Sequence, residues 1–432
     1  MGVDLGVDLD AKVTQALNVE AQDRCPDDFQ YWDNLDRPSV KKMRSLLKFL
    51  VGFDPVLPDD RIREFAQSYY ASDPIAEAVI TDLYKPGQAG KARDVLLQAL
   101  EQGVESLPDA PPSLVTLFDE LDSAPSWMDA EKVDHGARVF RRYGWFMFHF
   151  LGAITLEGYR ESSVAKPLAF TGAYDGSTAY KRFLETCNFW NEVAQPGGLD
   201  KGGKGRTTAV RVRVMHVVVR RHLANHKLWD EKAWGVPISQ ADSMVTLAAG
   251  SVGLGLGLKK MGFRFDKKDI EALLHFWRYV GYLMGVQPRW YPESYEDGVR
   301  FFFTIFAKGV KGSGEDGTRL SQGYLKAFEP DKNAPLWKRF KQTLNYRYQV
   351  GMTQYFITPQ THKHYGLPEG GLWKWFPATN IPFVFALETA RKNSRPLDDW
   401  LDKKVRQHSD RWLKQELGQY KPQYKPVDKL TR

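Results

Sequence analysis

The residues best suited to chemistry lie in one apolar run, which reads RVRVMHVVVRRH from Arg211 to His222. If this run is a helix, His216 shares a face with Arg213, three residues before it, and Arg220, four residues after it. A neutral imidazole can bind iron, and guanidinium groups pair with carboxylates, so the triplet suits a haem and its propionates. The alternative is a core histidine whose ring is satisfied by hydrogen bonds.

A second set of polar residues precedes this run. Arg182 lies three residues before Glu185 and four before Thr186, so a helix would place all three side chains on one face. A carboxylate beside a guanidinium can act as a general base or proton relay, and a threonine hydroxyl can hydrogen-bond an oxygen species. The same spacing is also typical of an ordinary ion pair on a solvated helix surface.

Five motifs resemble, in order and spacing, a family of haem-binding oxygenases. The family includes the latex-clearing proteins (rubber oxygenases) and the oxygenase of fungal mycophenolic acid biosynthesis. The resemblance covers residues 171–288 most strongly and the flanking helices only in general character. The motifs are Phe170-Thr-Gly172, Arg182-Phe-Leu-Glu-Thr186, the arginine-rich run around His216, Trp234-Gly-Val-Pro-Ile-Ser-Gln240, and the segment from His275 to Gly285.

The resemblance implies a b-type haem with His216 as the proximal iron ligand and Arg213 and Arg220 beside the macrocycle. It also implies a distal catalytic side formed by Arg182, Glu185 and Thr186. The expected reaction uses O₂ to oxidise an apolar, unsaturated or isoprenoid-like substrate, with dioxygenase-type cleavage of a carbon–carbon double bond favoured. Rubber-cleaving members carry a lysine at the position of Glu185, so this chain is expected to be an oxygenase outside the rubber-cleaving group.

Two other classes of function stay open on the sequence. One is a haem- or ligand-binding protein without turnover, such as a sensor or carrier, and the other is a haem-free helical scaffold. His149, which lies among phenylalanines, is the main rival for the iron, although a buried core histidine is the better interpretation. His222 and His226 indicate a solvated helix end, and Arg347 is a candidate third arginine near the haem.

Apolar periodicity predicts helices along most of the chain, and no alternating strand pattern of useful length occurs. The expected fold is all-α, with globin-like or bundle-like helix packing around the haem in a single large domain over residues 37–417. Residues 1–36 hold nine acidic and two basic groups and are predicted to be a loosely packed lead-in. Residues 418–432 are predicted to be an unpacked basic tail.

Composition excludes several classes of protein. The formal charge of +7 over 432 residues is too small to argue for nucleic acid, although the basic tail leaves peripheral contact with an anionic membrane open. Two distant cysteines and no secretory signal favour a reducing, cytoplasmic location. The longest apolar runs are shorter than the ~20 residues of a membrane-spanning helix, so no transmembrane segment is expected. The oligomeric state is left open.

Overall fold

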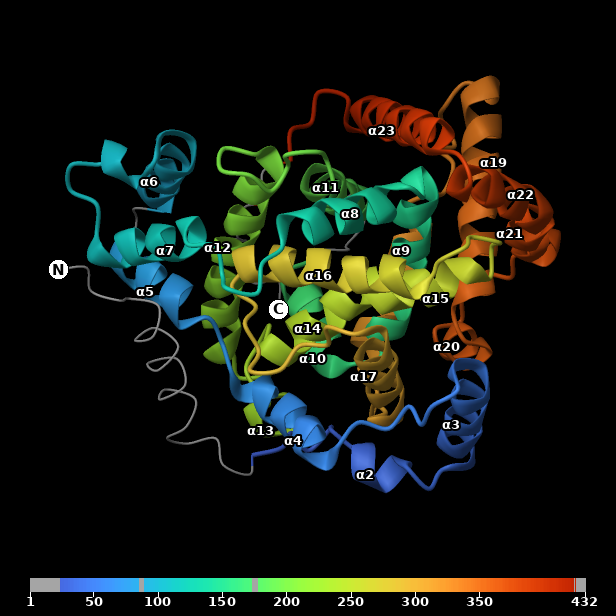
Figure 1. The fold of residues 1–432 in the computed structure, drawn as a ribbon, viewed down its shortest axis with the longest axis horizontal. Coiled ribbons are helices and arrows are strands. Elements are labelled where there is room, and N and C mark those ends of the chain that lie inside the picture. Colours follow the sequence, from blue (N-terminus) through green and yellow to red (C-terminus); the bar gives the residue numbers. More distant parts are fainter. Residues whose placement is uncertain (1–23, 85–88, 173–177, 423, 425–432) are drawn as a thin grey trace.

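The computed structural model describes residues 24–84, 89–172, 178–422 and 424, and these ranges contain helices and no strand, as predicted (Figure 1). In chain order the α-helices are α2 (Tyr31–Asn34), α3 (Pro38–Val51), α4 (Asp59–Gln67), α5 (Pro74–Leu83), α6 (Ala89–Gln102), α7 (Pro112–Asp122), α8 (Ala130–Arg141), α9 (Gly144–Gly158), α10 (Ser162–Phe170), α11 (Thr178–Val193), α12 (Lys204–Ala224), α13 (Glu231–Trp234), α14 (Gln240–Ala248), α15 (Leu254–Lys259), α16 (Lys267–Leu283), α17 (Tyr295–Ala307), α18 (Glu315–Lys326), α19 (Leu336–Phe356), α20 (Pro359–His364), α21 (Phe376–Thr379), α22 (Ile381–Lys392) and α23 (Arg395–Leu417). The shorter helical turns are η1 (Ser68–Tyr70), η2 (Val104–Ser106), the π-helical η3 (Ala249–Gly253) and η4 (Gly371–Trp375).

Helix α16 runs through the middle of the molecule with α8 along one side (Figure 1). A capping box between Asp266 and Asp269 begins the helix, and its apolar residues are buried along the whole length. The contact with α8 is close because Gly136 has no side chain: a Cβ there would lie 2.1 Å from the carbonyl oxygen of Ala272. Helix α12 packs against this same central helix, so the arginine-rich run is fixed to the core.

Helices α14, η3 and α15 form one continuous helical stretch, Gln240–Lys259. By length and composition alone this stretch is apolar enough to cross a membrane, with a mean hydropathy of 1.3. In the structure, however, 61% of that window is buried inside the fold, and the stretch packs against α16 and α17. Its apolar character is therefore explained by its place in the core of the helical domain.

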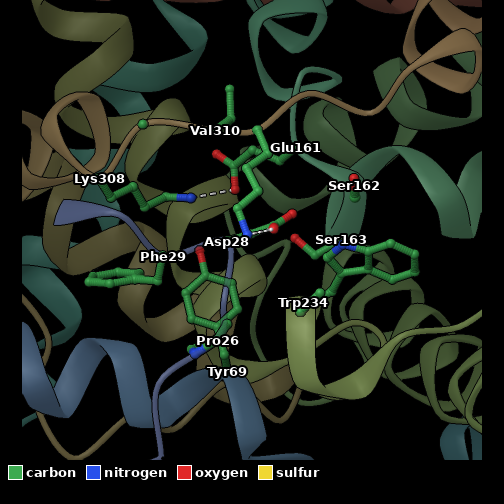
Figure 2. Close-up of a pocket in the computed structure, with 13 residues that line it drawn as sticks. Pro26, Asp28, Phe29, Tyr69, Glu161, Ser162, Ser163, Trp234, Lys308 and Val310 are labelled. Carbon is green, nitrogen blue, oxygen red and sulfur yellow. Dashed lines mark hydrogen bonds and ion pairs between the residues drawn. The ribbon is translucent and has the colours of Figure 1, made fainter. Parts of the chain in front are cut away.

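The prediction that residues 1–36 are loosely packed is wrong for residues 24–36, while residues 1–23 lie outside the described ranges. Phe29 and Tyr31 are buried in the main core, and the Asn34 amide donates to the carbonyl oxygen of Lys308 (3.1 Å). Next to them is a small polar pocket of about 20 Å³, where Lys308 donates to Glu161 (2.5 Å) (Figure 2). This space suits a water molecule and is too small for an isoprenoid or a haem.

The predicted tail, residues 418–432, is also partly packed. Helix α23 ends at Leu417, as expected, but Tyr424 is buried and its hydroxyl donates to the backbone carbonyl oxygen of Glu185 (3.1 Å). A hydroxyl paired with the chain more than 200 residues away cannot belong to a free end. The description of an unpacked tail therefore does not hold at Tyr424, and residues 425–432 lie outside the described ranges.

Candidate active site

Helices α11 and α12 pack against each other and are joined by a glycine-rich loop. Near the loop the two helices are close. Thr208 on α12 donates to Glu192 on α11 (2.5 Å), and the missing side chain of Gly205 allows α12 to approach the backbone of Val193. Arg182 lies 11 residues before the end of α11 and His216 lies 12 residues after the start of α12. Both are therefore about 17 Å from the loop and at a similar level along the pair.

His216 is a neutral and available imidazole. Burial lowers its pKa to about 4, and the positive charges of Arg220 and Arg182 act in the same direction. The side chain is partly exposed although Val217 is fully buried, and within the described ranges it makes no hydrogen bond or ion pair. The interpretation of His216 as a satisfied core histidine is therefore not supported, and its lone pair can ligate a metal.

Arg213 is buried in an ion-pair network, and its predicted place beside a haem stays a prediction. Its side chain is 1% exposed, and its Nε and Nη2 donate to the two carboxylate oxygens of Asp73 (2.7 and 2.9 Å). Its Nη1 lies 2.7 Å from a carboxylate oxygen of Glu120. The guanidinium thus ties α12 to the start of α5 and to α7, and its charge is neutralised before any propionate is considered.

Arg220 is likewise buried and fully engaged. Its Nη1 donates to Glu77 (3.0 Å), while Nε and Nη2 donate to the carbonyl oxygens of Pro237 (3.0 Å) and Ile238 (2.7 Å). Ile238 has a φ of 52°, a left-handed conformation that costs free energy for a β-branched residue. Arg220 therefore holds the strained Trp234–Gln240 turn against α12. Its predicted contact with a haem stays a prediction.

Arg182, Glu185 and Thr186 do come together on α11. Arg182 donates to Glu185 (3.2 Å), and Glu185 is 6% exposed, so this is not the solvated surface pair of the alternative interpretation. The other carboxylate oxygen of Glu185 accepts from the hydroxyl of Tyr420 (2.6 Å). Thr186 donates to the carbonyl oxygen of Arg182 (3.0 Å), which uses the one proton of its hydroxyl.

The other candidate residues are placed elsewhere. His149 is a buried core residue, as expected: its Nδ1 lies 2.6 Å from Nε2 of Gln349, and burial lowers its pKa to about 3. His222 is exposed at the end of α12, whereas His226 packs against the ring of Phe170. Arg347 is exposed on α19 and makes no hydrogen bond or ion pair among the described residues.

Sequence reasoning missed the partners of these residues. Asp73, Glu77 and Glu120 neutralise the arginines of α12, and Tyr420 holds Glu185. Of these partners, Asp73 carries a local signal, because an aspartate directly before a proline is typical of a helix start.

Of the residues predicted to hold a haem, His216 fits the requirements of the iron. A haem iron needs a neutral imidazole with a free lone pair, and His216 offers it. In the part of the chain that the structure describes, no group of three or more His, Cys, Asp or Glu could hold a bare metal ion. The arginines nearest in sequence present no free charge for the propionates.

Comparisons with known proteins agree with this fold. The model of the family described as "ER-bound oxygenase mpaB/B'/Rubber oxygenase, catalytic domain" matches residues 137–391, a range that contains both α11 and α12. A curated rubber oxygenase from Streptomyces sp. (strain K30) is 27% identical over 231 residues, 52% of this chain and 54% of the relative. The alignment thus spans about half the length of that relative.

A solved structure of the latex clearing protein LCP in its closed state has a similar fold. Its TM-score is 0.57 at 20% sequence identity, and the match covers 78% of this chain and 91% of that one. At this identity the likeness concerns the fold alone. The family model, which matches more than half of the chain, shows the relationship directly: the chain belongs to the mpaB and rubber oxygenase family.

Proposed function

We propose that the protein is a haem b-dependent oxygenase that uses O₂ to oxidise an apolar, isoprenoid-like substrate, with His216 as the iron ligand. Membership of an oxygenase family supports the reaction class. The observation that carries the cofactor proposal is the state of His216, which is neutral, partly exposed and without a hydrogen bond among the described residues. When bound, the haem would supply the redox-active iron at which O₂ is activated.

The residues of α11 shape the other side of the proposed site. Arg182 contributes a positive charge close enough to lower the pKa of His216, and Glu185 holds this guanidinium in place. Because Thr186 donates its only hydroxyl proton to the backbone, it is able to accept a hydrogen bond but must rotate before it donates one. Glu185, bound by Arg182 and Tyr420, acts in this proposal as a positioning group before it acts as a base.

The substrate class rests on the relatives and on one departure from them. A curated relative is named a rubber oxygenase, which supports an unsaturated isoprenoid-like substrate and a dioxygenase-type cleavage. The rubber-cleaving pattern carries a lysine where this chain has Glu185, and here the carboxylate is held by a tyrosine hydroxyl. We therefore propose a shorter or differently substituted isoprenoid than rubber itself.

Absorbance spectroscopy tests the cofactor proposal. Protein produced with sufficient haem is expected to show a Soret band and a b-type pyridine haemochrome, and His216→Ala is expected to lose both. His222→Ala is the matched control, because His222 is on the same helix but exposed. Wild-type protein without haem, or a His216→Ala variant with full haem content, would contradict the proposal.

A haem-binding protein without turnover is the second candidate function. The feature that favours it is Glu185, since both of its carboxylate oxygens already accept hydrogen bonds and no free base is evident on α11. Oxygen consumption separates the two. An oxygenase consumes O₂ when an unsaturated isoprenoid oligomer is added, whereas a sensor or carrier retains the haem spectrum without consuming O₂.

A further inference from the structure

One edge of the molecule, formed by α19, η4, α21 and α22, is unusually apolar for an exposed surface. Helix α19 contacts η4 and α21, and α21 contacts α22, and the three labelled helices lie together in Figure 1. Among the described residues sixteen large apolar side chains are exposed, and nine of them are here. We call this surface the α19–α22 face; its apolar residues are Leu336, Trp337, Phe340, Leu344, Leu372, Trp375, Phe376, Phe383 and Phe385.

The first half of α19 has the pattern of a helix that lies on a membrane surface. Trp337, Phe340 and Leu344 are spaced three and four residues apart, so they form one apolar stripe, and Trp337 is 66% exposed. The intervening charged residues are all basic, and the 21-residue helix contains no aspartate or glutamate. Exposed aromatic residues next to lysine and arginine are typical of helices in the interface of an anionic bilayer.

The charge of the surrounding segment points to the same partner. Residues 336–392 contain eight lysines and arginines and two glutamates, a net charge of +6, while the whole chain has a formal charge of +7. Glu388 and Arg391 neutralise each other in a buried ion pair (2.8 Å), and Lys392 pairs with Asp266 (2.8 Å), so these three residues add no net charge to the surface. The other six lysines and arginines of this segment and its one other glutamate still give a net charge of +5 where the aromatic residues are exposed.

An apolar cleft opens next to this face. It has a volume of about 340 Å³ and lies between α8, α9, α22 and α23, with Tyr143, Phe263, Leu387 and Val405 among its lining residues. Phe383 belongs to both features, because it lines the cleft and is 69% exposed. The face and the cleft therefore adjoin at this side chain, although the lining of the cleft also includes charged residues such as Arg142 and Asp402. A concave space of this kind beside the exposed aromatic residues could receive an apolar chain.

We propose that the α19–α22 face docks on the surface of an anionic lipid bilayer. The aromatic side chains enter the interface, the lysines and arginines pair with acidic headgroups, and the apolar cleft is held at the level of the acyl chains. This placement does not depend on haem binding or on turnover. It would bring an enzyme for apolar substrates to the phase in which such molecules are dissolved.

Co-sedimentation with vesicles tests the docking. Full-length protein is expected to bind vesicles of phosphatidylcholine with about one third phosphatidylserine, to bind pure phosphatidylcholine vesicles at least tenfold more weakly, and to be released by salt. Replacement of three charges in Lys338→Gln/Arg339→Gln/Lys341→Gln is expected to weaken binding about 100-fold, since each cation near the surface contributes about 1 kcal/mol. Trp337→Ser/Phe340→Ser is expected to weaken it at least tenfold.

The control is a second exposed apolar site beside basic residues, on α3. Phe49 is 85% and Leu50 65% exposed there, so Phe49→Ser/Leu50→Ser removes similar area from a different surface. This variant is expected to bind vesicles like the wild type. The proposal is overturned if the α3 variant is the one that loses binding, if anionic vesicles are not bound, or if the face forms a dimer in solution that Trp337→Ser/Phe340→Ser dissociates.

Discussion

The α11–α12 site and the α19–α22 face use the same kinds of residue in opposite ways. In both, basic residues are interspersed with large apolar residues on a 21-residue helix, α12 in one case and α19 in the other. On α12, Arg213 and Arg220 are buried and matched by carboxylates, whereas Arg347 on α19 is exposed and has no ion pair among the described residues. Matched cations hold a site together, and unmatched ones are available to a partner.

The largest expected effect on the free energy of unfolding comes from removing a buried arginine that is paired with carboxylates. Arg213→Ala leaves Asp73 and Glu120 buried without a counter-ion, and should lower the free energy of unfolding by about 3–5 kcal/mol. Denaturant unfolding measures this loss. Arg347→Ala is the control and should change stability by no more than about 0.5 kcal/mol. Equal effects of the two substitutions would show that Arg213 is not structural.

A smaller loss is expected at Glu77, which serves two arginines. Its carboxylate accepts hydrogen bonds from Arg220 (3.0 Å) and Arg221 (2.7 Å). Glu77→Gln therefore removes the negative counter-charge of both arginines and weakens the support of the strained Ile238 turn. We expect the free energy of unfolding to fall by about 2 kcal/mol. Unfolding in denaturant again provides the measurement. An unchanged midpoint would mean that the hydrogen bonds of Arg220 to the backbone are enough to hold the Ile238 turn.

The pH dependence of stability reports on the imidazole at the centre of the site. The pKa of His216 is lowered from 6.5 to about 4 in the fold, so between these pH values the unfolded chain binds a proton that the folded chain does not. Stability should therefore fall as the pH falls from about 6.5 to 4, by about 3 kcal/mol. His216→Gln should flatten this slope in haem-free protein. The contributions of the other titrating groups remain: His149 acts with the same sign, whereas Asp242, whose pKa burial raises to about 6, acts with the opposite sign.

A still smaller effect is expected at Tyr420. Tyr420→Phe removes only the hydroxyl that donates to Glu185, and should cost about 1 kcal/mol because this hydrogen bond is partly open to solvent. If Glu185 is a positioning group, the variant should also change the pH profile of oxygen consumption. A change in stability with no change in that profile would leave Tyr420 a purely structural role.

The smallest effect on stability is expected from the exposed basic residues of α19. Lys338→Gln/Arg339→Gln/Lys341→Gln removes three exposed charges from α19, and should change the free energy of unfolding by less than about 0.5 kcal/mol while it abolishes most vesicle binding. Thermal unfolding of the same preparations measures the first quantity. A large loss of stability would show that these charges support the fold and would remove the contrast with Arg213.

The sequence predicted well what depends on local spacing. The all-α fold follows from apolar periodicity, and Arg182 and Glu185 share a face of α11 because they are three residues apart. The partners of the α12 arginines could not be predicted, since Asp73 is 140 residues from Arg213 and no local pattern links them. Tyr420, 235 residues from Glu185, was placed in a tail for the same reason.

The three-way ion pair of Asp73, Glu120 and Arg213 also constrains how the family can diverge. Loss of Arg213 leaves two buried carboxylates without a counter-ion, whereas replacement of all three residues by apolar residues of similar volume is compatible with a stable fold. Substitutions at these positions should therefore be inherited together. Relatives that lack the arginine are expected to lack both acids as well, so that positions distant in the gene evolve together.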